Sequence, residues 1–179
     1  MNALSQSYFE WFGLPERFQI DPVVLAGAYR AVQTRVHPDR YVQALDSERR
    51  MAMQMATQAN EAYRTLQDPA RRARYLCERQ GVDLQIETNT AMPPAFLMQQ
   101  MEWREALDDA RAARDAGAID GLRTQLDGLR RELLTQIGQA IDEQADFQSA
   151  AARVRQLMFI DRFATELDDV QDRLTDGQH

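Results

Sequence analysis

Two amphipathic helical patterns lie on either side of the tripeptide His37-Pro38-Asp39, and together they restrict the N-terminal part of the chain to a helical hairpin. The first pattern has apolar residues at the spacing i, i+4, i+7, i+11 of one helix face, and a proline disfavours the α conformation of the residue before it. One helix is therefore expected to end at the tripeptide, and a second to begin after Ser47 and pack against the first. The apolar positions are Leu25, Tyr29, Val32 and Val36 in the first helix, and Ala52, Met55, Ala59, Ala62, Tyr63 and Leu66 in the second.

Short motifs flank the hairpin on both sides. The upstream residues are Tyr8, Phe9, Phe12, Gly13 and Leu14, and the downstream residues are Asn60, Glu61, Ala62, Tyr63, Leu66, Asp68, Pro69, Arg72 and Tyr75. His-Pro-Asp alone is also an ordinary helix stop, so the tripeptide by itself carries little information. Between two amphipathic helices and with these flanks, it resembles a J domain, the co-chaperone module that turns on ATP hydrolysis in DnaK-type chaperones.

Composition excludes several classes of enzyme site. All 21 basic side chains are arginine, so the chain has neither the lysine of a Walker-A phosphate loop nor one for a Schiff base. Cys77 is the only cysteine, which excludes an internal disulfide and a cysteine-based zinc module. The only histidines are His37 and His179, and no pattern fixes a nucleophile near either of them. We expect a protein that is not an enzyme and has no cofactor or metal site.

Charge is divided unevenly along the chain. Residues 1–80 hold 11 Arg and 9 acidic residues, a net charge of +2, whereas residues 81–179 hold 10 Arg and 19 acidic residues, a net charge of −9. An acidic half without a basic stripe argues against a nucleic-acid partner, because such binding depends on neutralising phosphates.

No apolar run approaches the roughly 20 residues that span a bilayer, and no secretory signal is apparent. We therefore expect a cytoplasmic protein with no membrane partner.

The second half of the chain predicts a three-helix bundle. Gly81, Asp83, Thr88, Asn89, Thr90, Pro93 and Pro94 break every periodic pattern and indicate a linker. Helical patterns follow at roughly 94–116, 119–145 and 147–175, with mixed spacings of three and four. The middle pattern is Ile119, Leu122, Leu126, Leu129, Leu133, Ile137 and Ile141, and the last is Ile160, Phe163, Leu167, Val170 and Leu174. The sequence thus predicts an all-α protein with domains at 1–80 and 94–176, joined by a linker at 81–93.

The first helix of the predicted bundle has two apolar faces. Phe96, Trp103, Leu107 and Ala110 form one continuous stripe that suits the bundle core. Leu97, Met98 and Met101 lie on another side of the helix among Glu102 and Glu105. Exposed Leu and Met beside carboxylates are typical of a protein-binding patch. The alternative is that the linker or the first domain folds over these residues.

Residues at the start of this helix sharpen the resemblance. Ala95, Phe96, Leu97 and Met98, followed by Glu102, Arg104, Glu105 and Leu107, resemble the signature of HscB, the J-type co-chaperone of bacterial iron–sulfur cluster assembly, and the similarity runs from Tyr8 to about Leu174. The resemblance implies an L-shaped, all-α protein with an N-terminal J domain and a C-terminal three-helix domain. It also implies that the C-terminal domain binds the cluster scaffold IscU, and that the J domain delivers the scaffold to the chaperone HscA and stimulates its ATPase.

The resemblance also implies which residues meet each partner. The scaffold-binding residues would be Leu97, Met98, Met101, Glu102, Glu105 and Phe159. The chaperone-binding residues would be His37, Pro38 and Asp39, joined by the arginines Arg30, Arg35 and Arg40, which fall off the apolar stripe near one end of the hairpin. Met101 and Trp103 stand where the family pattern leads us to expect leucine, and we expect Met101 to shift the scaffold contact without abolishing it.

Two other interpretations stay open at this point. One is a general J protein for unfolded clients, although the chain lacks a Gly/Phe-rich segment and a Cys-rich zinc repeat. The other is a helical adaptor in which the hairpin loop is only structural. For Cys77, a small buried apolar side chain is the simplest interpretation.

Overall fold

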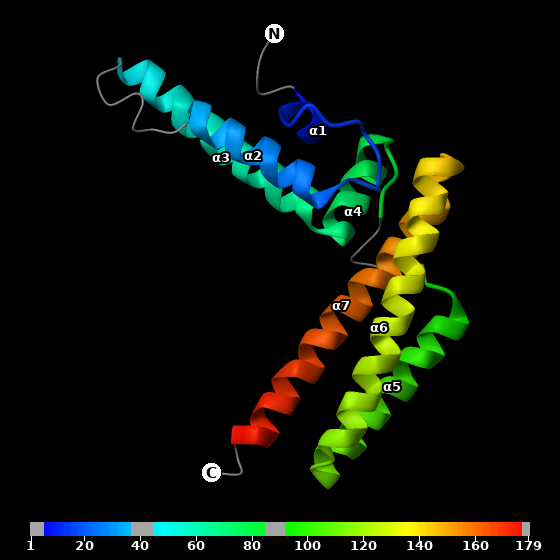
Figure 1. Ribbon diagram of the computed structural model, residues 1–179. Helices are drawn as coiled ribbons and strands as arrows, with labels where there is room; N and C mark the ends of the chain where they lie inside the picture. Colours follow the sequence, from blue (N-terminus) through cyan, green and yellow to red (C-terminus); the bar gives the residue numbers. More distant parts are fainter. Residues whose placement is uncertain (1–5, 37–44, 85–91, 177–179) are drawn as a thin grey trace. The chain divides into compact units, whose positions relative to one another are not determined.

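The computed structural model describes residues 6–36, 45–84 and 92–176, and every regular element in these ranges is helical. By its internal contacts the chain divides into two compact units, Met1–Leu76 and Cys77–His179 (Figure 1). The first unit contains α1 (Tyr8–Trp11), α2 (Pro22–Val36), α3 (Asp46–Gln67) and most of α4 (Pro69–Arg79). The second contains α5 (Pro94–Ala113), α6 (Ala116–Gly138), the π-helical turn η4 (Gln139–Glu143) and α7 (Phe147–Asp176). The all-α expectation is confirmed.

In the first unit, α2 and α3 pack side by side as an antiparallel pair (Figure 1). The apolar stripes predicted from the sequence form the seam: Leu25, Val32 and Val36 are buried on α2, and small alanines on α3 allow the helices to approach closely. The buried alanines of α3 are Ala52, Ala59 and Ala62. α3 begins at Asp46, one residue before Ser47, because the Glu48 carboxylate accepts a hydrogen bond from the Leu45 backbone N–H at 3.1 Å.

Aromatic residues from the two flanking motifs join the short helices to this pair. The Tyr8 and Tyr75 rings stack with their centroids 4.4 Å apart, and the Tyr75 hydroxyl accepts a hydrogen bond from the Tyr8 N–H at 3.0 Å. Ser7 caps α1 by accepting from the Glu10 N–H, and the Glu10 carboxylate accepts from the Ser7 N–H in return. The buried guanidinium of Arg72 lies over the Phe18 ring, 5.1 Å from its centroid. The flanking motifs therefore fix the ends of the hairpin.

In the second unit, α5, α6 and α7 run alternately up and down (Figure 1). The apolar stripes of all three helices meet in one core, as the periodicity predicts. Buried members are Phe96, Trp103 and Leu107 on α5, Ile119, Leu126, Leu133 and Ile137 on α6, and Val154, Leu157, Ile160, Phe163 and Leu167 on α7.

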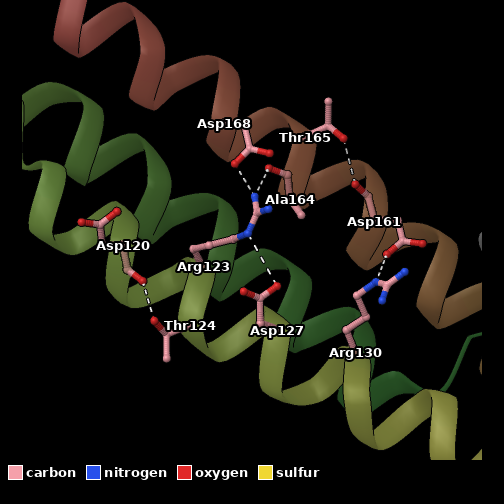
Figure 2. A network of polar contacts seen from close by, with 9 residues as sticks. All are labelled: Asp120, Arg123, Thr124, Asp127, Arg130, Asp161, Ala164, Thr165 and Asp168. Atoms are coloured by element: carbon pink, nitrogen blue, oxygen red, sulfur yellow. Dashed lines mark hydrogen bonds and ion pairs between the residues drawn. The ribbon is translucent and has the colours of Figure 1, made fainter.

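Ion pairs cross the outer edge of the seam between α6 and α7. Figure 2 shows Arg123 of α6 reaching both Asp168 and the Ala164 carbonyl of α7, and Arg130 reaching Asp161 at 2.7 Å. Each of these side chains is at least a third exposed, so the pairs contribute modestly to stability. Their main consequence is that the carboxylates of Asp161 and Asp168 are turned towards α6.

The start of α6 and its connection to α7 both differ from the sequence prediction. α6 starts at Ala116 rather than 119, because the Asp115 carboxylate accepts from the Ala118 N–H at 3.0 Å. At its other end the helix changes to the π-helical turn η4, which periodicity did not predict because Ala140 and Ile141 stay buried through it. Ala145 then adopts φ +52°, a left-handed conformation that is unfavourable for a residue with a Cβ.

Residues that the sequence assigned to a linker are partly buried in the second unit. Val82 and Leu84 are buried, and the Arg155 guanidinium of α7 donates to the Leu84 carbonyl at 3.2 Å.

Cys77 on α4 is also fully buried, with its thiol 3.7 Å from the Phe147 carbonyl. Burial raises the pKa of the Cys77 thiol to about 11. The thiol is thus a small core side chain, as expected, and is protonated at neutral pH.

Candidate functional site

The residues expected to meet the chaperone fall into two groups. His37, Pro38, Asp39 and Arg40 lie outside the described residues. Arg30 and Arg35 lie on α2, where both side chains are exposed, as the sequence predicts. Because Leu25, Val32 and Val36 turn the opposite face of α2 into the core, the helix presents its arginines to solvent.

The position of α2 is fixed by a cluster centred on Tyr29. Its ring stacks on Tyr63 of α3 with the centroids 4.0 Å apart, and its hydroxyl donates to the Asn60 side-chain carbonyl at 2.8 Å. Phe12 meets the same ring edge-on, with the centroids 6.2 Å apart. Asn60 and Tyr63 belong to the motif downstream of the tripeptide, so that motif holds α2 in register with α3.

α5 has the two faces that its sequence predicts. Trp103 and Leu107 are buried, whereas Met98 and Met101 are 60% and 71% exposed. Glu102 and Glu105 are exposed beside the methionines. Large apolar side chains this exposed have no packing role within the described part of the unit, so α5 presents an adaptable apolar surface bordered by carboxylates. We call Met98, Met101, Glu102 and Glu105 the α5 outer face.

Leu97 departs from the expectation that it faces solvent with the two methionines. It is half-buried. At about 100° per residue it lies only about 100° from Phe96, on the border between the two faces of α5, whereas Met98 lies on the opposite side. Leu97 therefore contributes partly to packing, and the methionines form the exposed centre of the surface.

Phe159 of α7 belongs to an aromatic cluster next to this surface. Its ring lies 5.8 Å from both Phe96 and Phe163 and 6.3 Å from Trp103, centroid to centroid. The indole N–H of Trp103 is the one polar group among these four rings. It donates a hydrogen bond to the Gln125 side-chain carbonyl at 3.2 Å. Phe159 is half-buried, so part of its ring stays accessible beside α5.

Sequence reasoning did not find a pocket that opens beside Phe159. Arg104 of α5 and Arg162 and Glu166 of α7 line it, and its volume is about 330 Å³. The only sequence signal for it is angular: Arg104 lies three residues after Met101, next to it on the helix surface. Arg104 and Arg162 come together in this pocket only because of how α5 packs against α7. No local sequence pattern predicts that packing.

Comparison with known proteins identifies the family. The model of the HSCB C-terminal oligomerisation domain matches residues 92–168, which include α5, α6 and most of α7. The co-chaperone protein HscB homolog of Bordetella pertussis is 56% identical over 167 residues, covering 93% of this chain and 97% of that protein. This chain belongs to the HscB family of co-chaperones. The family identity supports a co-chaperone role in iron–sulfur cluster assembly.

Solved structures of HscB proteins share the fold. The chaperone HscB from Vibrio cholerae is 39% identical with a TM-score of 0.84, covering 94% of this chain and 99% of that chain. The human co-chaperone HscB is 25% identical with a TM-score of 0.87, covering 92% of this chain and 81% of that chain. The expected architecture of an N-terminal J domain followed by a helical C-terminal domain is therefore confirmed. The relatives are named co-chaperones, which are not a class of enzymes.

Two further kinds of site are absent from the described residues. No helix there combines the length and apolarity needed to cross a membrane. The same part of the chain holds no group of three or more His, Cys, Asp or Glu side chains arranged to bind a metal ion. Among the described residues of this HscB protein, large apolar side chains are exposed on α5, at Met98 and Met101, and also on α2 and α3, at Val23, Val24, Met51 and Met53.

Proposed function

We propose that this HscB protein binds an IscU-type scaffold protein through its C-terminal unit and delivers it to a DnaK- or HscA-type chaperone. The N-terminal unit stimulates the ATPase of that chaperone, so that hydrolysis closes the chaperone on the scaffold and cluster transfer follows. The iron–sulfur cluster is cargo carried by the scaffold, and no residue of this chain is proposed to ligate it. In this proposal the domains 1–80 and 94–176 each serve one partner in the cytoplasm.

The observation that carries the scaffold half of the proposal is the contrast between the two faces of α5. Met98 and Met101 are exposed on a helix whose opposite face is buried, so the helix keeps its place when those two side chains meet a partner. Burying apolar side chains of this size releases roughly 25 cal/mol per Å² of apolar surface. Glu102 and Glu105 add charges that favour a partner with basic groups beside its apolar patch. Leu97 and Phe159 would lie at the border of this contact.

The chaperone half rests on α2 and on the tripeptide after it. Arg30 and Arg35 are exposed, and both belong to the half of the chain with a net positive charge. A J domain is expected to meet an acidic surface of the chaperone ATPase, and charges of this kind accelerate encounter more than they strengthen the final complex. His37, Pro38, Asp39 and Arg40 complete the proposed contact.

The direct test of the chaperone half is the variant His37→Gln. Its expected result is loss of ATPase stimulation in a DnaK- or HscA-type chaperone, measured as steady-state phosphate release. Helicity and scaffold affinity should not change, because His37 belongs to the first unit and the proposed scaffold contact to the second. His179→Gln is the matched control, the same substitution at the other histidine of the chain, and should stimulate as the wild type does.

The same assay separates the alternatives. A helical adaptor with no J-domain activity would leave the ATPase rate unchanged in the wild type itself. A general J protein would stimulate the chaperone but would not bind the scaffold in preference to an unfolded protein. Full stimulation by a folded His37→Gln variant would contradict the J-domain mechanism.

A further inference from the structure

The pocket beside Phe159 is a cationic site at the edge of the α5 outer face. α5 contributes Gln100 and Arg104 to its lining, and α7 contributes Phe159, Arg162 and Glu166. At about 330 Å³ it has room for the end of a side chain from another protein. Two guanidinium groups and a single carboxylate line it, so its net charge is positive within a half of the chain whose net charge is −9.

Glu166, the one carboxylate that lines the pocket, does not neutralise the charges of both arginines. Arg104 approaches Glu166 at 4.0 Å, which is longer than a hydrogen bond, and their side chains are 60% and 42% exposed. An exposed ion pair of this length contributes little and can rearrange at little cost. Arg162 is exposed; its Nε lies 3.4 Å from the Met158 carbonyl, and among the described residues it has no ion pair with a carboxylate.

The nearest acidic neighbour of Arg162 in the chain is turned elsewhere. The Asp161 carboxylate pairs with Arg130 of α6, as Figure 2 shows, so it does not neutralise the pocket between α5 and α7. The Phe159 ring lies under Arg104, whose guanidinium carbon is 6.0 Å from the ring centroid. A guanidinium held over an aromatic face keeps its N–H fork available for a planar carboxylate.

The order of residues around α5 connects this pocket to the proposed scaffold contact. At about 100° per residue, Arg104 lies about 60° from Met101 on one side, Glu105 lies between Met101 and Met98, and Glu102 lies beyond Met98. The α5 surface therefore has a cationic edge at Arg104, on the side of α7, and becomes acidic at Glu105 and Glu102, with the methionines among them. A partner with the opposite order of charges would bind in only one orientation.

We propose that this pocket receives the carboxylate of one Asp or Glu side chain of the docked scaffold protein, held by Arg104 and Arg162 above Phe159. This inference rests on the proposed scaffold binding and names a contact within it. The carboxylate fixes the direction in which the scaffold lies on α5, because its charge is attracted by the cationic edge and repelled by Glu102 and Glu105.

The test uses Arg162→Gln and Arg104→Gln in the full chain, with binding to a purified IscU-type scaffold measured by calorimetry. Each variant should bind about five- to tenfold more weakly, because it removes one charge-assisted contact. Arg131→Gln, at an exposed arginine of α6, is the matched control and should bind as the wild type does. Arg162→Lys should bind with intermediate affinity, since it keeps the charge but loses the fork. Thermal unfolding should be unchanged in all four variants.

Double-mutant cycles identify the carboxylate on the scaffold. Each exposed Asp or Glu of the scaffold is changed to its amide, and one of these changes should weaken binding to Arg162→Gln and to Arg104→Gln less than it weakens binding to Arg131→Gln. Wild-type affinity for Arg162→Gln and Arg104→Gln would overturn the inference but leave the proposed function intact. Equal weakening against every scaffold variant would also overturn it, as would light scattering that shows a dimer of the wild type which Arg162→Gln dissociates. Absence of scaffold binding by the wild type would overturn the proposed function itself.

Discussion

α2 and α5 are built alike and differ in what they leave exposed. Each buries one apolar face in the core of its own unit, Leu25 on α2 and Leu107 on α5 being almost fully buried. Away from that face α2 exposes Arg30 and Arg35, together with Val23 and Val24 in its first turn, whereas α5 exposes Met98 and Met101. Charged side chains attract a partner from a distance, while exposed methionines gain free energy only when a partner covers them. The two surfaces therefore suit two different steps: encounter with a chaperone and retention of a scaffold.

The largest expected effect comes from the buried faces, where the two helices should behave alike. Leu25→Ala and Leu107→Ala should each lower the free energy of unfolding by about 2 to 5 kcal/mol, because a buried cavity adds to the lost transfer free energy. Urea denaturation followed by circular dichroism measures this loss. Under conditions where it is folded, Leu107→Ala should still bind the scaffold within about twofold of the wild type. A loss of affinity without a loss of stability would show that Leu107 belongs to the interface instead.

The next effect separates the two exposed faces by their response to salt. Arg30→Glu combined with Arg35→Glu should lower ATPase stimulation several-fold at low ionic strength, and the wild-type stimulation should itself decrease as salt rises, because screening acts over about 10 Å at 0.1 M. Scaffold affinity should keep the share contributed by Met98 and Met101 at high salt and lose only the share contributed by the charged side chains around them. If ATPase stimulation were unchanged by both the charge reversals and the salt concentration, the arginines of α2 would contribute only to solubility.

The smallest effect tests whether stability and binding are separable in the second unit. Ala145→Gly should raise the free energy of unfolding by about 0.5 to 1 kcal/mol, since glycine adopts the observed φ of +52° without the steric cost of a Cβ. Neither scaffold affinity nor ATPase stimulation should change. Destabilisation by this substitution would mean that the left-handed conformation at Ala145 carries no strain.

Local patterns predicted most of the fold because periodicity and caps act within a helix. The stripes containing Leu25, Leu66 and Leu167 became buried seams, and α7 begins at Phe147, where its pattern starts. Helix starts were displaced by up to three residues where a side chain such as Asp115 caps the helix ahead of the apolar pattern. The π-helical turn η4 was missed because buried residues continue through it.

The candidate site was predictable where it depends on one helix and not where it depends on two. The exposure of Met98 and Met101 followed from their angle on α5 alone. Leu97 was misplaced because its angle lies at the border between the faces, where packing decides exposure. The pocket formed by Arg104 and Arg162 requires the register of α5 against α7, which is a tertiary property with no signal in sequence spacing.

One measurement tests the account most directly: calorimetric titration of the scaffold with the double variant Met98→Ala and Met101→Ala, paired with urea denaturation of the same sample. The account predicts a dissociation constant raised by about 30-fold or more, equivalent to more than about 2 kcal/mol, because exposed apolar anchors usually dominate an interface. The free energy of unfolding should change little, since both side chains face solvent in the free protein. Wild-type affinity in the double variant, or unfolding of its C-terminal unit, would contradict the assignment of the α5 outer face to the scaffold.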